Sequence, residues 1–220
     1  MAVPVEKKKY TVREYLERER RSLEKHEYHD GEILMMAGGT RNHSLIIANM
    51  IRETGLSLKG TPCRVYDSNL RIRIHGAAFY TYPDVSVVCG EPHLDTDDSF
   101  GETVTNPRLI VEVISPTSEG YDRGRKFDQY RMIESLYEYV LVWQDTARVE
   151  AFFRQGGGSW MFTPISGLDK SIKLQSLKIE LPLGEIYDGV EFPVASDSTP
   201  PAAENSAGAA PPPDRIPPNS

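Results

Sequence analysis

Two acidic residues lie inside stretches of sequence that otherwise have the pattern of buried strands. Asp84 follows Pro83 near the start of the apolar run 82–89, and Glu112 lies in the middle of the run 108–115. Burying an unpaired carboxylate in a strand is costly even after the surroundings relax. If the two strands are neighbours, both acids can bind one divalent cation, which removes that cost. The pair therefore predicts a metal site.

A basic segment provides a third chemical group close to these acids in the chain. Lys126 lies in the segment 118–133, which we expect to be a helix. Mg²⁺ takes few protein oxygens and keeps several waters, one of which can become a nucleophile. An ammonium group beside that water, or beside a phosphate oxygen, completes a set of groups suited to phosphodiester hydrolysis.

The composition bounds the class of protein. A chain of 220 residues can form one domain with a proper core. No apolar stretch approaches the roughly 20 residues that span a bilayer, and the N-terminus lacks the apolar region of a signal peptide. We therefore expect no membrane partner and a cytoplasmic location. Cys63 and Cys89 make no disulfide framework, and Cys89 is expected to pack as a small buried hydrophobe.

The charge distribution bears on a nucleic-acid partner. The net charge of −7 lowers the expectation of nucleic-acid binding, but a compact acidic protein can still present a basic cleft. Local basic groups are formed by Arg13, Arg18, Arg20 and Arg21, by Arg71 and Arg73, and by Arg123, Arg125, Lys126 and Arg131.

The first third of the chain predicts a helix, a hairpin and a second helix. Thr11 and Glu14 have the spacing of a capping box for a helix that ends near residue 23. Asp30-Gly31 is a strong two-residue hairpin signal. Asn42 is the expected N-cap of a helix over residues 43–59.

The remainder predicts mainly strands. We expect a half-buried strand over 64–74, a polar loop that projects into solvent over 91–107, and a strand over 137–144. Residues 148–154 and 160–164 should pair as a hairpin, and residues 177–181 and 183–190 close the domain. The predicted organisation is a flexible N-terminus (1–9), one domain (10–193) and a disordered Pro/Ala-rich tail (194–220).

Several of these motifs occur together in one known family. Pro83-Asp84, the segment 112–118, the segment 122–130 and the segment 138–143 resemble the Uma2 family of the PD-(D/E)XK, or restriction-endonuclease-like, superfamily. The resemblance covers roughly residues 10–190. It implies an α/β fold in which a restriction-endonuclease-like core, a central mixed β-sheet flanked by helices, carries an added C-terminal β-hairpin region.

The resemblance also implies an activity and a set of site residues. It implies metal-dependent cleavage of nucleic acid, with Asp84 and Glu112 as Mg²⁺ ligands and Mn²⁺ as a substitute metal. The sequence leaves DNA and RNA both open as substrates, and we expect DNA in preference to RNA. The backbone carbonyl of Val113 is a further candidate ligand. In the standard motif the lysine lies two residues after the glutamate, where this chain has Ile114; Lys126, on the following helix, is the matching lysine.

Each assignment has a structural alternative. Asp84 could be satisfied by backbone N–H groups, and Lys126 could be a solvated helix charge. Glu27 is a candidate third acid of the site or a hairpin ion-pair partner. Tyr130 shares the helical face of Lys126, either as a packing residue or as an additional site residue that orients the lysine. His43 is interpreted as a capping or packing residue and is left out of the catalytic set.

Two further functions stay open at this point. The displaced lysine and the acidic charge also suit a nuclease fold that has lost turnover and binds nucleic acid or protein. A carboxylate-pair glycosidase is the third candidate, although neither tryptophan lies near the acids in the sequence. A homodimer is compatible with cutting both strands of a duplex.

Overall fold

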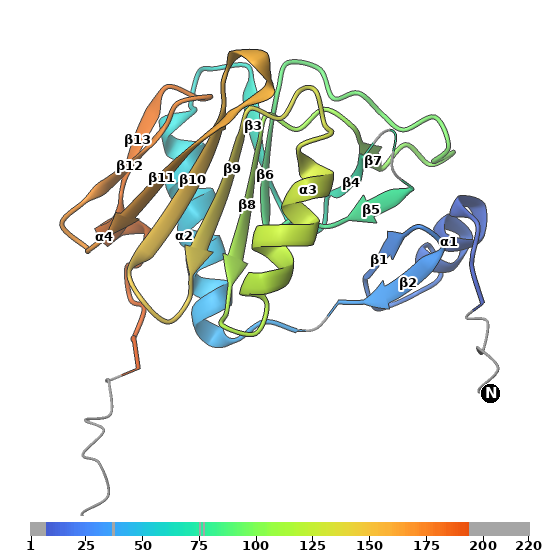
Figure 1. Cartoon of the computed structure of the whole chain (residues 1–220), viewed down its shortest axis with the longest axis horizontal. Helices are drawn as coiled ribbons and strands as arrows, with labels where there is room; N and C mark the ends of the chain where they lie inside the picture. The colour runs from blue at the N-terminus through green and yellow to red at the C-terminus, as the bar shows by residue number, and fades with distance from the viewer. Residues whose placement is uncertain (1–7, 37, 75, 77, 194–220) are drawn as a thin grey trace, which may run out of the picture.

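The computed structural model describes residues 8–36, 38–74, 76 and 78–193. Its centre is a mixed six-stranded sheet with the order β11-β10-β9-β8-β6-β3 (Figure 1). Neighbouring strands are antiparallel except for β8 and β9, which are parallel. The strands of this sheet are β3 (Cys63–Asp67), β6 (Val85–Cys89), β8 (Leu109–Ile114), β9 (Glu138–Trp143), β10 (Arg148–Arg154) and β11 (Trp160–Ser166).

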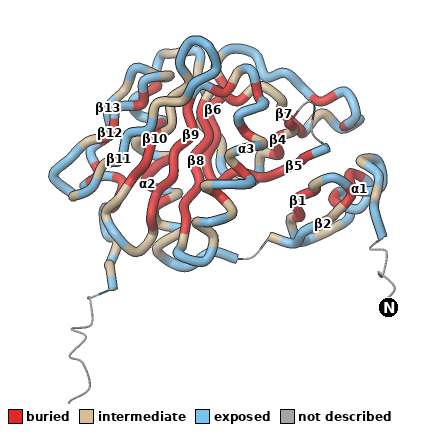
Figure 2. Tube along the Cα trace, viewed as in Figure 1, coloured by how far each residue is buried: buried red, intermediate tan, exposed pale blue. Residues whose placement is uncertain are grey.

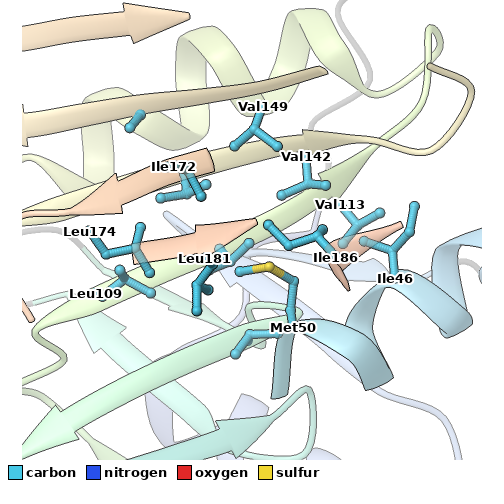
Figure 3. Close-up of a cluster of buried hydrophobic side chains, with 14 of the residues drawn as sticks. Ile46, Met50, Leu109, Val113, Val142, Val149, Ile172, Leu174, Leu181 and Ile186 are labelled. Carbon is cyan, nitrogen blue, oxygen red and sulfur yellow. The ribbon is translucent and has the colours of Figure 1, made fainter. Parts of the chain in front are cut away.

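The central strands are covered on both faces, as their continuous apolar runs predict (Figure 2). Successive side chains of a strand point to opposite faces, so β8 divides its residues between two cores. Figure 3 shows the core on one face, where the sheet packs against helix α2 (Arg41–Ser57) and the C-terminal elements. These C-terminal elements are β12 (Ser171–Leu174), β13 (Ile179–Pro182) and α4 (Leu183–Ile186).

The opposite face of the sheet is covered by a short helical segment, which begins as the π-helix η1 (Tyr121–Lys126) and continues as α3 (Phe127–Tyr130) (Figure 1). Ile110 and Ile114 of β8 lie in this second core with Tyr130. Glu112 lies between them in the strand and therefore points to the same face. The predicted helix over 118–133 is thus present in a shorter form.

A second, five-stranded sheet has the order β2-β1-β5-β4-β7. Tyr15 of helix α1 (Val12–Glu19) is fully buried against it and stacks on Tyr28, with ring centroids 5.1 Å apart. The strands are β1 (His26–His29), β2 (Glu32–Met35), β4 (Arg71–Ile74), β5 (Phe79–Thr81) and β7 (Thr103–Val104).

Local signals in the N-terminal part are confirmed with adjusted boundaries. The Thr11–Glu14 capping box is present, and Asp30 and Gly31 both have positive φ, as a type I′ hairpin turn requires. Helix α1 ends at Glu19 rather than near residue 23, because the chain turns back and the Glu19 carboxylate accepts the N–H of His26 at 2.9 Å. The N-cap of α2 is Thr40, not Asn42.

Two predictions for the middle of the chain are correct only in part. The expected strand 64–74 is divided between the two sheets as β3 and β4, and Arg71 is buried rather than on an exposed face. The segment 91–107 is largely exposed, as predicted, but it also contains β7 and two buried acids. Its Asp95 and Asp98 are buried because they pair with Arg73 and Arg71.

The cysteines also differ from expectation. Cys63 and Cys89 face each other across β3 and β6 and form a disulfide, so Cys89 is not a free buried hydrophobe. Among the described residues, no helix has the length and apolar character needed to cross a bilayer. The predicted tail 194–220 and residues 1–7 of the predicted N-terminal segment 1–9 lie outside the described residues.

Candidate active site

Adjacent strands bring the two predicted acids together. Val85 of β6 is the register partner of Val111 of β8, so Asp84, immediately before β6, lies opposite Glu112 on the same face. The Asp84 carboxylate accepts the backbone N–H of Val113 at 2.7 Å. The carboxylate thus accepts a hydrogen bond that a backbone carbonyl would accept if β6 began earlier. The predicted alternative, that backbone N–H groups satisfy Asp84, is therefore partly correct.

Lys126 lies at the centre of the site although it comes from a helix. Its Nζ is 3.0 Å from Glu112 Oε1, 3.2 Å from Glu27 Oε1 and 3.6 Å from Asp122 Oδ1. The side chain is almost completely buried, with 5% of the residue exposed. It is therefore not a solvated helix charge. The lysine is the last residue of η1, and such widened helical turns occur often at functional sites.

Glu27 reaches the same site from the second sheet. It lies on β1, it is buried, and its carboxylate accepts hydrogen bonds from the Thr81 and Tyr121 hydroxyls. Burial raises its pKa, but the charge of Lys126 and these hydrogen bonds outweigh burial, so the net pKa is lowered. Glu27 is therefore an ionised partner of the lysine.

Tyr130 holds the central acid. Its hydroxyl donates to Glu112 Oε1 at 2.7 Å, and its fully buried ring packs against Tyr139. It is thus more than the packing residue that helical spacing indicated. Because the ring is fixed by the core, the hydroxyl fixes the orientation of the Glu112 carboxylate.

Sequence reasoning missed His43 and Asp122. His43 Nε2, in the first turn of α2, is 3.2 Å from Asp84 Oδ2. Burial lowers the pKa of His43, but the hydrogen bond and charge of Asp84 and the backbone of Val113 raise it overall. Asp122 could have been found, because it lies four residues before Lys126 on the same helical face. No local signal pointed His43 toward Asp84.

The site contains more negative than positive groups. Burial raises the pKa of Glu112, Lys126 lowers it, and the charges of Asp84 and Asp122 raise it again, to about 8 in all. Burial likewise raises the pKa of Asp122. Burial alone would lower the pKa of Lys126, but the surrounding acids raise it well above the usual value, so the lysine keeps its proton.

These residues fit a hard divalent cation. Within the described ranges, no three His, Cys, Asp or Glu side chains form a ready-made metal cage. Mg²⁺ does not need one, since it usually takes one or two carboxylates and keeps its waters. Asp84 and Glu112 supply two carboxylates, and the backbone of Val113 lies beside Asp84. The unbalanced negative charge around Glu112 is what a cation would offset.

The chain matches the family model of Uma2, described as "Putative restriction endonuclease", over residues 12–184. It is also similar to two uncharacterized proteins of Synechocystis sp. One, slr1290, is 36% identical over 84% of this chain and 94% of the relative. The other, sll1609, is 37% identical over 81% of this chain and 100% of the relative.

A solved structure shares the fold. It is the crystal structure of a protein from Anabaena variabilis described as a putative nuclease belonging to DUF820. The TM-score is 0.64 at 17% sequence identity, and the match covers 81% of this chain and 97% of that one. The chain thus shares the α/β fold of that structure, and the predicted central mixed sheet flanked by helices is confirmed, with a second, five-stranded sheet beside it.

Proposed function

The chain belongs to the Uma2 family, and we propose that it is a metal-dependent endonuclease that hydrolyses phosphodiester bonds of nucleic acid, DNA in preference to RNA. One observation carries this proposal. The buried ammonium of Lys126 lies 3.0 Å from Glu112, which faces Asp84 across two paired strands. Two acids and a lysine on one sheet face are the groups that metal-assisted phosphodiester cleavage needs.

Asp84 and Glu112 would hold Mg²⁺, or Mn²⁺ in its place, together with the carbonyl of Val113. When bound there, the metal supplies a water of lowered pKa and a charge that polarises the phosphate. His43 and the N–H of Val113 fix the Asp84 carboxylate, and Tyr130 fixes that of Glu112. Fixed acids favour a single geometry for the reacting groups.

Lys126 would act on the attacking water or on the phosphate. Its ammonium can donate a hydrogen bond to the attacking water, or to a phosphate oxygen on which negative charge develops in the transition state. Glu27 and Asp122 keep it protonated and in place. In this arrangement Glu27 positions the lysine from the second sheet.

The test is cleavage of plasmid and single-stranded DNA in the presence of Mg²⁺. We expect cleavage by the wild-type protein, and no cleavage with EDTA or with Asp84→Ala or Glu112→Ala. Glu180→Ala is the matched control, because Glu180 is an exposed acid on β13. Circular dichroism verifies that each variant is folded. Cleavage by Glu112→Ala at the wild-type rate would place the activity elsewhere.

The runner-up is a nuclease fold that binds nucleic acid or protein without turnover. It is favoured by the contacts of Glu112, whose Oε1 already accepts from Tyr130 and pairs with Lys126. Calorimetry with Mg²⁺ separates the two functions. The endonuclease binds Mg²⁺ and loses that binding in Glu112→Ala, whereas the binding module takes up no Mg²⁺ in either protein.

A further inference from the structure

Most arginines near the site are already neutralised by carboxylates. Arg123 pairs with the buried Glu150 at 2.6 Å, and Arg131 pairs with Asp128 at 2.8 Å. These guanidinium groups are unsuited to a second anion, since binding it would give up an existing ion pair.

Arg125 has a different partner. Its guanidinium contacts the imidazole Nδ1 of His29 at 2.8 Å. Arg125 is exposed, whereas its neighbour Lys126 is buried among the acids. The two consecutive residues therefore place one cation inside the site and one immediately outside it.

Strand β1 supplies both partners. Glu27 and His29 are two residues apart, so they share one face of β1, and they contact Lys126 and Arg125 respectively. η1 and β1 therefore contact each other through two pairs of side chains, Lys126 with Glu27 and Arg125 with His29. The inner pair belongs to the chemistry already described, and the outer pair lies on its rim.

His29 is fixed and leaves Arg125 free to donate. Its ring stands edge-on to Phe79, its register partner on β5, with centroids 5.2 Å apart. Burial and the charge of Arg125 lower the pKa of His29, so the neutral imidazole accepts one hydrogen bond. A guanidinium has five N–H donors in a planar fork, which suits a phosphate.

A nucleic acid also needs such a contact. The chain has a net charge of −7, and the reacting phosphate must approach a site rich in carboxylates. Phosphate contacts from Arg and Lys supply most of the affinity of non-specific nucleic-acid binding and fix the register of the strand. A cation at the rim provides both.

We propose that Arg125, oriented by His29, binds a non-bridging oxygen of a backbone phosphate next to the scissile one. This phosphate subsite rests on the proposed nuclease function. It assigns Arg125 to substrate binding and His29 to positioning of Arg125, and it places the bound strand across η1 beside β1.

The experiment measures binding separately from cleavage. A fluorescent single-stranded DNA oligonucleotide is titrated in EDTA over a range of salt concentrations. Arg125→Gln should weaken binding about tenfold, the effect of losing one charge-assisted hydrogen bond. It should also reduce the slope of log affinity against log salt by about 0.7, the value for one phosphate contact on a single strand. Arg125→Lys should keep the slope and lose part of the affinity.

Two controls make the result specific. Arg131→Gln removes an exposed arginine of the same region that is paired with Asp128, and it should bind as the wild type does. Oligonucleotides with a single neutral methylphosphonate linkage locate the contact. One linkage should weaken the wild type and have no effect on Arg125→Gln.

The outcomes separate this subsite from the proposed activity. An unchanged affinity and slope in Arg125→Gln, or an equal loss in Arg131→Gln, would overturn the subsite even if the protein cuts DNA. If the protein cuts no substrate but Arg125→Gln still lowers the salt slope, Arg125 binds a backbone phosphate of the non-cleaving binding module, and both the endonuclease proposal and the placement next to a scissile phosphate fail.

Discussion

Two buried groups of charged residues stabilise their cations in different ways. Arg71 is bound by Asp98 at 2.8 Å, and it donates to the Tyr82 hydroxyl at 3.0 Å and the Thr103 hydroxyl at 2.7 Å. One forked cation thus meets one carboxylate and two neutral oxygens. Around Lys126, one ammonium faces three carboxylates.

The titration of the acids reflects this difference. Burial raises the pKa of Asp98, but hydrogen bonds from Thr103 and Arg71 lower it overall. The pKa of Glu112 instead rises to about 8, because burial adds to the repulsion from neighbouring acids despite Lys126. The balanced charges around Arg71 stabilise the contact between two segments of the chain. The excess of acids around Lys126 can still bind a further cation.

The largest effect should come from Glu112→Gln, which removes the charge and keeps the shape. Nuclease activity should fall by at least about 10²-fold, because a metal ligand is lost. The variant should remain as stable as the wild type or become more stable at neutral pH, since a crowded buried acid is gone. Parallel cleavage assays and urea denaturation measure both. A variant that loses activity only because it unfolds would contradict the distinction between the two groups.

Arg71→Leu should have the opposite profile. Removing the cation leaves Asp98 buried and uncompensated, which typically costs about 3–5 kcal/mol of unfolding free energy. Urea denaturation measures this loss. Arg13→Leu is the matched control, because Arg13 forms an exposed pair with Glu17 on α1 and should denature close to the wild type. A loss in Arg71→Leu no larger than that of the control would show that this ion pair is not structural.

The pH dependence of stability should reveal the raised pKa of Glu112. The folded state keeps a proton that the unfolded chain releases above its ordinary pKa of 4.5. Stability should therefore fall as pH rises from 4.5 to about 8 and level off above that, with a slope of at most about 1.4 kcal/mol per pH unit from this group. Urea midpoints of wild type and Glu112→Gln across this range test it. Parallel curves would show that Glu112 titrates normally.

The smallest effect is expected for Tyr130→Phe. It removes the hydroxyl that donates to Glu112 and should cost about 1 kcal/mol of stability. This hydrogen bond lowers the pKa of Glu112, so its loss should raise that pKa further. The rise of nuclease activity with increasing pH, which follows the ionisation of Glu112, should then shift to higher pH. Tyr121→Phe, which affects Glu27 instead, is a useful comparison.

The two strand acids could be predicted from the sequence because each interrupts an otherwise apolar run. Asp84 and Glu112 are conspicuous for this reason, and the two-residue turn at Asp30-Gly31 has an equally local cause. Lys126 was predicted from the basic segment that follows the acids in the chain, and the family resemblance matched it to the displaced lysine of the motif. The structure brings Glu112 and Lys126 into contact and places Asp84 opposite Glu112.

What remained hidden depends on pairing between distant segments. His43 looked like a capping residue because Asp84 is distant from it in the sequence, although the fold brings the two side chains within 3.2 Å. The burial of Asp95 and Asp98 within an otherwise exposed polar segment was also hidden, since their arginine partners lie on another strand. The disulfide between Cys63 and Cys89 likewise depends on the register of β3 and β6, which cannot be predicted from a single sequence.

The position of Lys126 on a helix has a consequence for synthesis on the ribosome. Glu27, Asp84 and Glu112 all emerge before the lysine, and β9, β10 and β11, half of the six-stranded sheet, emerge after it. A nascent chain that ends before residue 126 therefore carries these acids without the ammonium that pairs with Glu27 and Glu112. Such an unfinished chain has the proposed ligands of the site but not its charge balance.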